Sequence, residues 1–269
     1  MRKLFISADI EGVCGIADWK ETELSSEEGA YFRAEMTREV AAVCEVALDE
    51  GVEEVLVKDA HDSGRNIDPS LLPENVKILR SWTKDPLVMM AGLDGSFDGA
   101  CYIGYHSAGG TDGNPLAHTM TTNLIEIKVN GIRASEFLLN AWTSASLGVP
   151  SLLLSGDKAL CETAAGLFPG IRTVAVSEGR GNASISINPG LARRRIAEAA
   201  RSAIVEADRS KGPAVAVLPP SFEVEVSYRQ HWQAYRASFY PGALRTGPLG
   251  AGFSAKDWYE VLRFLFFVL

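Results

Sequence analysis

Six ionisable residues stand out in this chain because their types and positions suit metal binding. They are three carboxylates and three imidazoles, which are the oxygen and nitrogen ligands that zinc takes in hydrolytic sites. The six residues are Asp9, Glu11, His61, His106, His118 and Glu136. A metallohydrolase is therefore the function that the residues themselves favour.

Most of these residues follow apolar runs that are typical of buried strands. Ligands in open α/β sheets bind outside the carboxyl ends of the strands, so we expect the side chains to form one cluster. Asp9 and Glu11 follow the apolar run 4–8, His61 follows the run 55–59, and His106 follows the run 100–105. On an extended chain Asp9 and Glu11 point the same way, so together they could bind one cation, and one of them could bridge two.

Taken one at a time, these residues also have ordinary structural explanations. An acid beyond a strand can face solvent, and a loop histidine can pack without a ligand. Glu136 lies in the first turn of a helix expected to begin near Ser135, where an acid favours the helix dipole without any metal. Asp59 or Asp62 could orient the ring of His61, as ligating histidines require. The coincidence of several such residues is what favours a shared site.

The elements that would position these residues alternate between strands and helices. A strand at 4–8, a helix at 26–50 and a strand at 54–58 form a βαβ unit, which implies parallel pairing. We therefore predict an α/β fold with a mostly parallel central sheet flanked by helices and a second, smaller α/β portion. The predicted domains are a metal-binding α/β domain over residues 1–150 and a second α/β domain over residues 151–269.

Further elements are predicted along the rest of the chain. The alternating residues 125–129, followed by Asn130 and Gly131, predict a hairpin. Residues 222–228 also alternate, as an antiparallel edge strand would. The remaining predictions are strands at 76–79, 99–103, 151–154, 172–176 and 214–218, and helices at 86–93, 159–167, 190–207 and from about 254.

Composition excludes several classes of protein. The 269 residues carry a formal net charge of −8, which argues against a nucleic-acid partner. The apolar residues 263–269 are too few to span a bilayer, so we expect no membrane partner and instead docking into the core or a subunit interface. The four cysteines are far apart and form no CxxC pair, which favours a reduced, cytoplasmic protein.

An ordered series of motifs points to one family. It opens with Ser7-Ala8-Asp9-Ile10-Glu11-Gly12, which matches a Ser-x-Asp-x-Glu-Gly pattern. It continues through Asp59-Ala60-His61, Gly104-Tyr105-His106, His118, Ser135-Glu136 with Asn140, Ser155-Gly156-Asp157, Tyr240-Pro241-Gly242 and Ala255-Lys256-Asp257. Covering nearly the whole length in the expected order, this series resembles that of the DppA-type zinc D-aminopeptidases.

The resemblance implies a metal-dependent aminopeptidase that hydrolyses short peptides or amides from the N-terminus with a preference for D-amino acids. It implies a binuclear site holding two Zn²⁺ per subunit, and a ring-shaped homo-oligomer such as a decamer. The implied roles are Asp9 as the bridge, Glu11 with His106 on one ion, His61 with Glu136 on the other, and His118 as the catalytic histidine.

Three alternatives remain open at this stage. One is a metallopeptidase or amidohydrolase with another stereochemical or substrate preference, and a second is a non-catalytic, metal-stabilised peptide-binding relative. The third, a metallophosphoesterase, is weaker because the chain has neither Asp-x-His at its first site nor Gly-Asn-His. Residues 176–182 depart from the family pattern, which tends to carry basic groups near Ser177 and Asn182, so substrate specificity could also differ.

Overall fold

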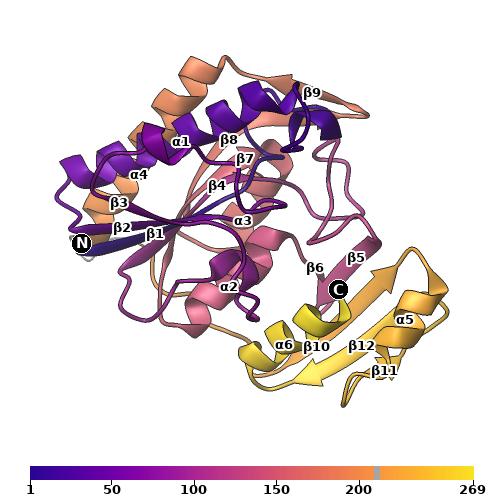
Figure 1. The fold of residues 1–269 in the computed structure, drawn as a ribbon. Coiled ribbons are helices and arrows are strands. Elements are labelled where there is room, and N and C mark those ends of the chain that lie inside the picture. The colour runs from indigo at the N-terminus through magenta and orange to yellow at the C-terminus, as the bar shows by residue number, and fades with distance from the viewer. Residues whose placement is uncertain (209–212) are drawn as a thin grey trace.

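The computed structural model describes residues 1–208 and 213–269, which form a seven-stranded and a five-stranded sheet (Figure 1). The larger sheet has the order β3-β2-β1-β4-β7-β8-β9, and its neighbouring strands are parallel except for β8 and β9. Its strands are β1 Lys3–Ala8, β2 Glu54–Asp59, β3 Val76–Leu79, β4 Gly99–Tyr105, β7 Ser151–Asp157, β8 Arg172–Arg180 and β9 Ala183–Ser186.

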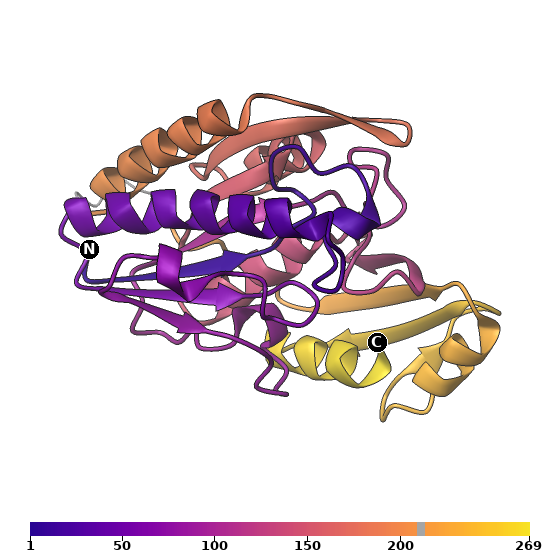
Figure 2. The same cartoon turned by 45° about the horizontal axis from the view of Figure 1, so that its top comes forward.

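Helices cover both faces of this sheet. On one face, α1 (Gly29–Asp49) and α4 (Pro189–Asp208) lie side by side (Figures 1 and 2). On the other face lie α2 (Glu136–Ser146) and α3 (Lys158–Leu167). Burial on both faces explains why the central strands are apolar throughout and do not alternate with polar residues. The predicted α/β class with a mostly parallel, helix-flanked sheet is confirmed.

The smaller sheet is antiparallel and has the order β11-β12-β10-β5-β6. Its strands are β5 Leu124–Val129, β6 Ile132–Arg133, β10 Phe222–Tyr228, β11 Leu244–Arg245 and β12 Gly250–Ala255, and its helices are α5 His231–Ala237 and α6 Trp258–Val268. The predicted hairpin joins β5 to β6, with positive φ values of 51° at Asn130 and 76° at Gly131. Helix α6 contacts both β12 and α2, so it links the two parts of the fold.

Several predicted elements differ from the structure. Residues 214–218 do not form a strand, although Ala216 and Leu218 pack against the core and Val217 is 94% exposed. The segment pairs with no strand of either sheet, so its alternating sequence reflects the burial of one side and does not indicate a strand. The predicted helix at 86–93 is one short 3₁₀ turn, η3, at Val88–Met90. Two other 3₁₀ turns are η1 Trp19–Glu21 and η2 Pro69–Leu71.

The C-terminal region also differs from its prediction. Strand β10 lies between β12 and β5 in the centre of its sheet and is not an edge strand. The last helix begins at Trp258, capped by Asp257, because Ser254 still belongs to β12. Gly250, Ala251 and Gly252 have low strand propensity, which hid β12 from pattern analysis.

Neither sheet is confined to one half of the chain. Strands β7 to β9 extend the larger sheet beyond residue 150, while β5 and β6 join the smaller sheet from before it. The two sheets therefore do not coincide with the predicted division into residues 1–150 and 151–269, which stays a prediction. Over the described ranges, no helix is both long and apolar enough to cross a membrane. All four cysteines are buried free thiols.

Candidate metal centre

The sheet order creates a switch point between β1 and β4. From β1 the chain adds β2 and β3 on one side, and from β4 it adds β7 and β8 on the other. Asp9, His61 and His106 follow the carboxyl ends of β1, β2 and β4, which lie next to one another. This is the place where open α/β sheets bind ligands.

Close backbone approach at this point explains the glycine of the first motif. The N–H of Gly12 donates to the carbonyl of Gly104 over 2.8 Å. A Cβ added at Gly12 would lie 1.8 Å from the carbonyl oxygen of Tyr105, so only glycine fits. The turn after β1 can therefore pack against the end of β4, which brings Glu11 beside the residues that follow β4.

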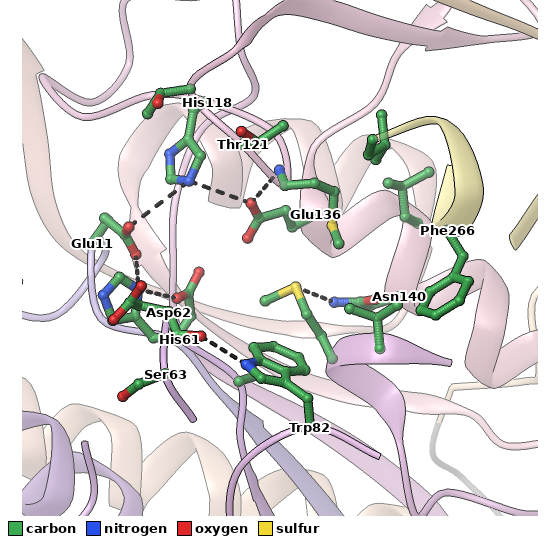
Figure 3. Close-up of a pocket in the computed structure, with 18 of the residues that line it drawn as sticks. Glu11, His61, Asp62, Ser63, Trp82, His118, Thr121, Glu136, Asn140 and Phe266 are labelled. Atoms are coloured by element: carbon green, nitrogen blue, oxygen red, sulfur yellow. Dashed lines mark hydrogen bonds and ion pairs between the residues drawn. The ribbon is translucent and has the colours of Figure 1, made fainter. Parts of the chain in front are cut away.

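Two further residues reach the site from outside the large sheet. Glu136 is the first residue of α2, and the hydroxyl of Ser135 caps the helix by accepting the Leu138 N–H over 3.2 Å. A carboxylate oxygen of Glu136 accepts the N–H of Met120 over 2.6 Å, and the Thr119 hydroxyl donates to the Ala134 carbonyl over 2.8 Å. These bonds fasten the loop that carries His118 to the start of α2 (Figure 3).

The structure places all six predicted residues together. The side chains of Asp9 and Glu11 contact His61, with Nδ1 of His61 3.4 Å from Asp9 Oδ1 and 3.1 Å from Glu11 Oε2. Nε2 of His106 lies 3.5 Å from Asp9 Oδ2 and 3.4 Å from Glu136 Oε2. Nε2 of His118 lies 3.9 Å from Glu11 Oε1 and 3.7 Å from Glu136 Oε1. Five of the six residues are buried, and His118 is partly exposed.

Hydrogen bonds to the backbone fix which nitrogen of each histidine faces the carboxylates. A carbonyl can only accept, so each of these bonds assigns a proton to the nitrogen that points away from the cluster. Nε2 of His61 donates to the Thr22 carbonyl, Nδ1 of His106 to the Ser107 carbonyl, and Nδ1 of His118 to the Leu116 carbonyl, over 3.1, 3.0 and 2.9 Å. The inner nitrogens thus turn toward the carboxylates, as in metal-ligating histidines whose outer N–H is held by a carbonyl.

Several atoms at the centre of the cluster are buried without a hydrogen bond. Among the described residues, Asp9 Oδ2, Glu11 Oε2 and His106 Nε2 find no hydrogen-bond partner. Buried polar atoms are normally satisfied, so these atoms point to a missing ligand between them. Burial, followed by the nearby charges of Glu11 and Glu136, raises the pKa of Asp9 well above its ordinary value. Burial opposes the protonation of His106, but the Glu136 carboxylate raises the pKa of that imidazole on balance.

The candidate ligand atoms fall into overlapping groups of three, each with its atoms within 4.8 Å of one another. The groups are Asp9 with Glu11 and His61, Asp9 with His106 and Glu136, and Glu11 with His106 and His118. The shortest distances pair Glu11 with His61 and Glu136 with His106, and Glu11 also shares a group with His106, so the pairing that the resemblance implied stays a prediction. Because β1 lies between β2 and β4, Asp9 is central while His61 and His106 lie on opposite sides.

A layer of supporting residues holds the ligand loops. The carboxylate of Asp59 accepts the N–H groups of Asn66 and Ile67 over 2.6 and 2.7 Å, and the Asn66 amide donates to the His61 carbonyl over 2.7 Å. The carboxylate of Asp157 accepts both the N–H and the hydroxyl of Ser107 over 2.6 Å, directly after His106. These bonds give the Asp59 and Asp157 motifs a positioning function.

Two aromatic residues of the site were missed by sequence reasoning. Trp19 packs edge-on against His118 with ring centroids 5.2 Å apart, and Trp82 donates its indole N–H to the Asp62 carbonyl over 2.7 Å. Trp19 belongs to the short 3₁₀ turn η1 and Trp82 to an irregular segment after β3, and no periodic signal marks either of them. By contrast, Ser177 and Asn182 are absent from the described residues that line the cavity beside the cluster.

A buried cluster of carboxylates and imidazoles at the switch point of an α/β sheet is the type of site that metal-dependent hydrolases have. A family model described as D-aminopeptidase (peptidase M55) matches residues 1–267, so the chain belongs to this D-aminopeptidase family. The predicted resemblance is therefore confirmed.

Two individual proteins are similar to the chain over almost its full length. A D-aminopeptidase of Bacillus subtilis (strain 168) is 30% identical over 266 residues, covering 97% of this chain and 94% of the relative. The solved structure of the Zn-dependent D-aminopeptidase DppA from Bacillus subtilis, described as a self-compartmentalizing protease, matches with a TM-score of 0.90 and 26% identity. That match covers 99% of this chain and 96% of the other.

Proposed function

We propose that the chain is a zinc-dependent aminopeptidase that hydrolyses the first bond of short peptides or amides and prefers a D-residue at the amino terminus. Membership of the D-aminopeptidase family supports the reaction and its stereochemistry. The observation that carries the proposal is the orientation of the three histidines, whose outer N–H groups are held by carbonyls while their inner nitrogens face buried carboxylates.

The donor set fits zinc. A neutral imidazole nitrogen that faces a carboxylate oxygen in a buried site is unfavourable unless a proton or a cation lies between them. The buried atoms of Asp9, Glu11 and His106 that lack a hydrogen bond support a bound cation. Two of the candidate ligand groups share Asp9. Asp9, Glu11 and His61 would hold one ion, and Asp9, His106 and Glu136 the other.

Two zinc ions held there would supply Lewis acids for the substrate carbonyl and a nucleophile from water at neutral pH. The residues of the chain would do the rest. His118 is the most exposed of the three clustered histidines, and its Nε2 is free of backbone bonds. We assign it the proton transfer to the leaving amine, because general acids must reach the departing group from the substrate side. Direct attack by the same nitrogen is the alternative role.

We also propose that the chain assembles into a ring-shaped homo-oligomer, such as a decamer, and that it works in the cytoplasm. The description of the solved relative as self-compartmentalizing supports assembly. Exposed aromatic side chains on and after α5 offer a surface for it: Trp232, Tyr235 and Phe239. Four free cysteines support a reducing compartment.

The test is hydrolysis of matched D- and L-alanine para-nitroanilides and dipeptides, with metal content measured on the same preparation. We expect turnover of the D-substrates, about two zinc ions per chain, and loss of activity on chelation. Turnover of the L-substrates alone would keep the metallopeptidase and remove the stereochemical preference. Bound zinc without any turnover would favour the non-catalytic peptide-binding relative, and a protein without metal affinity would contradict the proposal.

A further inference from the structure

The cavity beside the cluster has two chemically different ends. It has a volume of about 1180 Å³, and the ionisable residues of the cluster other than His106 line one end of it. The other end is lined by apolar side chains of α6 and by the segment between β3 and η3, which contributes Trp82, Pro86 and Leu87 together with Lys84 and Asp85 (Figure 3). Ligand pockets commonly combine an apolar lining with a few polar groups that fix orientation. The cavity therefore suits a ligand with a polar head and an apolar side chain.

Helix α6 supplies one apolar wall. Its cavity-lining residues are Leu262, Leu265, Phe266 and Leu269. Their spacings of three, four and seven residues place them along one face of a helix. The opposite side of α6, which includes Val261 and Phe264, is fully buried in the core. Helix α6 is therefore apolar on both sides. One side packs in the core, and the other lines the cavity.

The facing wall comes from residues 82–89 and is held in place by specific contacts. The indole of Trp82 is fixed by its hydrogen bond to the Asp62 carbonyl and by the ammonium group of Lys58, which lies 4.1 Å from its ring centroid. Val88 lines the same wall with a φ of 48°, which is strained for a β-branched residue. Backbone strain of this kind persists where the surrounding structure enforces it, often at binding sites.

Helix α2 runs from the cluster toward the apolar end of the cavity. Glu136 belongs to the cluster, and Asn140 lines the cavity one helical turn further along α2, which is about 5.4 Å. Phe266 lies near Asn140 in the cavity (Figure 3). An extended peptide advances roughly 3.3–3.6 Å per residue. A peptide whose first carbonyl lies at the cluster would thus bring the side chain of its first or second residue to this wall.

We propose that Trp82, Phe266 and the leucines of α6 form a subsite for a large apolar side chain on one of the two residues that flank the cleaved bond. This inference rests on the proposed aminopeptidase function and narrows its substrates from short peptides in general to those with a leucine-sized or phenylalanine-sized side chain. A small side chain such as that of alanine would leave the apolar wall facing water. A charged one would lose hydration against the leucines and Phe266 of α6, which offer it no polar partner.

The experiment compares two series of D-configured dipeptides. In one, the first residue is alanine, leucine, phenylalanine or aspartate and the second is glycine; in the other, the first is alanine and the second varies in the same way. We expect kcat/KM to be about 10- to 100-fold higher for leucine or phenylalanine than for alanine in one of the series, since hydrophobic pockets discriminate by such factors. Equal values, or a preference for alanine or aspartate in both series, would overturn the subsite.

Variants of two adjacent residues test the position of the subsite. Phe266→Ala should lower kcat/KM for the leucine or phenylalanine substrate and so remove most of the preference for large side chains, and Phe266→Leu should keep most of it. Phe267→Ala is the matched control, because Phe267 is 65% exposed and does not line the cavity. Equal effects of Phe266→Ala and Phe267→Ala would overturn the assignment.

A binding measurement separates failure of the subsite from failure of the proposed function. If no dipeptide is cleaved, the affinities of the same peptides for the zinc-loaded protein are measured by calorimetric titration instead of hydrolysis rates. Tighter binding of the phenylalanine peptide than of the alanine peptide, lost in Phe266→Ala and kept in Phe267→Ala, would uphold the subsite without the aminopeptidase. Equal affinities, or no binding of any peptide, would overturn the subsite as well.

Discussion

The imidazole rings of His106 and His118 stack with their centroids 4.4 Å apart and their planes 13° from parallel. His106 follows a buried strand and its side chain is 0% exposed, whereas His118 comes from the next loop and its side chain is 14% exposed. Stacking fixes the ring of His118 and leaves one edge open toward the cavity. The two histidines thus divide into a buried group suited to hold a cation and an accessible group suited to meet substrate.

Replacing His118 by alanine should lower kcat while zinc content stays unchanged. A general acid or base contributes on the order of 10²- to 10⁴-fold, so we expect a loss of that size. Metal content by mass spectrometry and steady-state rates on one preparation would check this. His231→Ala is the control, because His231 is exposed on α5 and absent from the cavity lining. Near-normal turnover of His118→Ala would contradict the role given to His118.

Removing zinc should destabilise the folded protein. Three carboxylates lie close together in a buried site, and a ligand that binds only the folded state stabilises it by about 2.7 kcal/mol at a free concentration 100 times its Kd. We expect a chelator to lower Tm of the wild type by several degrees and to have little effect on Asp9→Asn. Calorimetry with and without chelator would measure both shifts. Asp62→Asn, at the exposed rim of the cavity, should respond like the wild type.

The strand ends were the part of the site that could be predicted from the sequence. Asp9, His61 and His106 follow strongly apolar runs, and parallel strands bring such ends to one edge, so their proximity follows from the topology. Glu136 and His118 could not be placed this way. Their positions depend on the hydrogen bonds of Met120 and Thr119, which are tertiary contacts without a sequence period.

The smaller sheet could be predicted only in part for a related reason. Strand β10 alternates clearly, but nothing in that alternation shows whether both of its edges are paired. The glycine-rich β12 becomes a strand because β10 and β11 lie on either side of it. The cavity wall on α6 was equally hidden, since the apolar C-terminal residues predict burial and do not show that one face lines a cavity.

Stability should depend on pH through Glu39, which is buried on α1 and accepts the N–H of Cys14 over 3.1 Å. Burial raises the pKa of its carboxyl group from 4.5 to about 8. Between these values the unfolded chain loses a proton that the folded protein keeps. The contribution of Glu39 to the free energy of unfolding is therefore fully present below pH 4.5. It decreases as the pH rises toward 8, by at most about 1.4 kcal/mol per pH unit.

Urea unfolding of wild type and Glu39→Gln between pH 5 and pH 9, about the range set by these two values, would measure this dependence. The glutamine keeps an acceptor for Cys14 and cannot ionise, so the free energy of unfolding should vary less with pH in the variant. Glu45→Gln, exposed on the same helix, should follow the wild type. Parallel curves for Glu39→Gln and wild type would show that Glu39 ionises normally in the folded protein.

Assembly should depend on the aromatic side chains that follow one another along α5 and just after it. Tyr235 is 55% exposed and Phe239 is 69% exposed, and their rings contact each other with centroids 4.9 Å apart. Exposed apolar patches commonly mark protein interfaces, and burying a carboxylate in one is unfavourable. We expect the double variant Tyr235→Glu, Phe239→Glu to shift the particle mass from an oligomer to smaller species in light scattering after size exclusion.

The control for this experiment is Ile185→Glu, which adds a carboxylate at a residue 56% exposed on β9, in the other sheet. This variant should retain the mass of the wild type. Circular dichroism would show that both variants keep the fold, because none of the three positions is buried. A wild type that is monomeric at all concentrations would contradict assembly itself. Equal masses for both variants would place the subunit interface away from α5, since a carboxylate introduced at a subunit contact lowers affinity whereas one on a free surface does not.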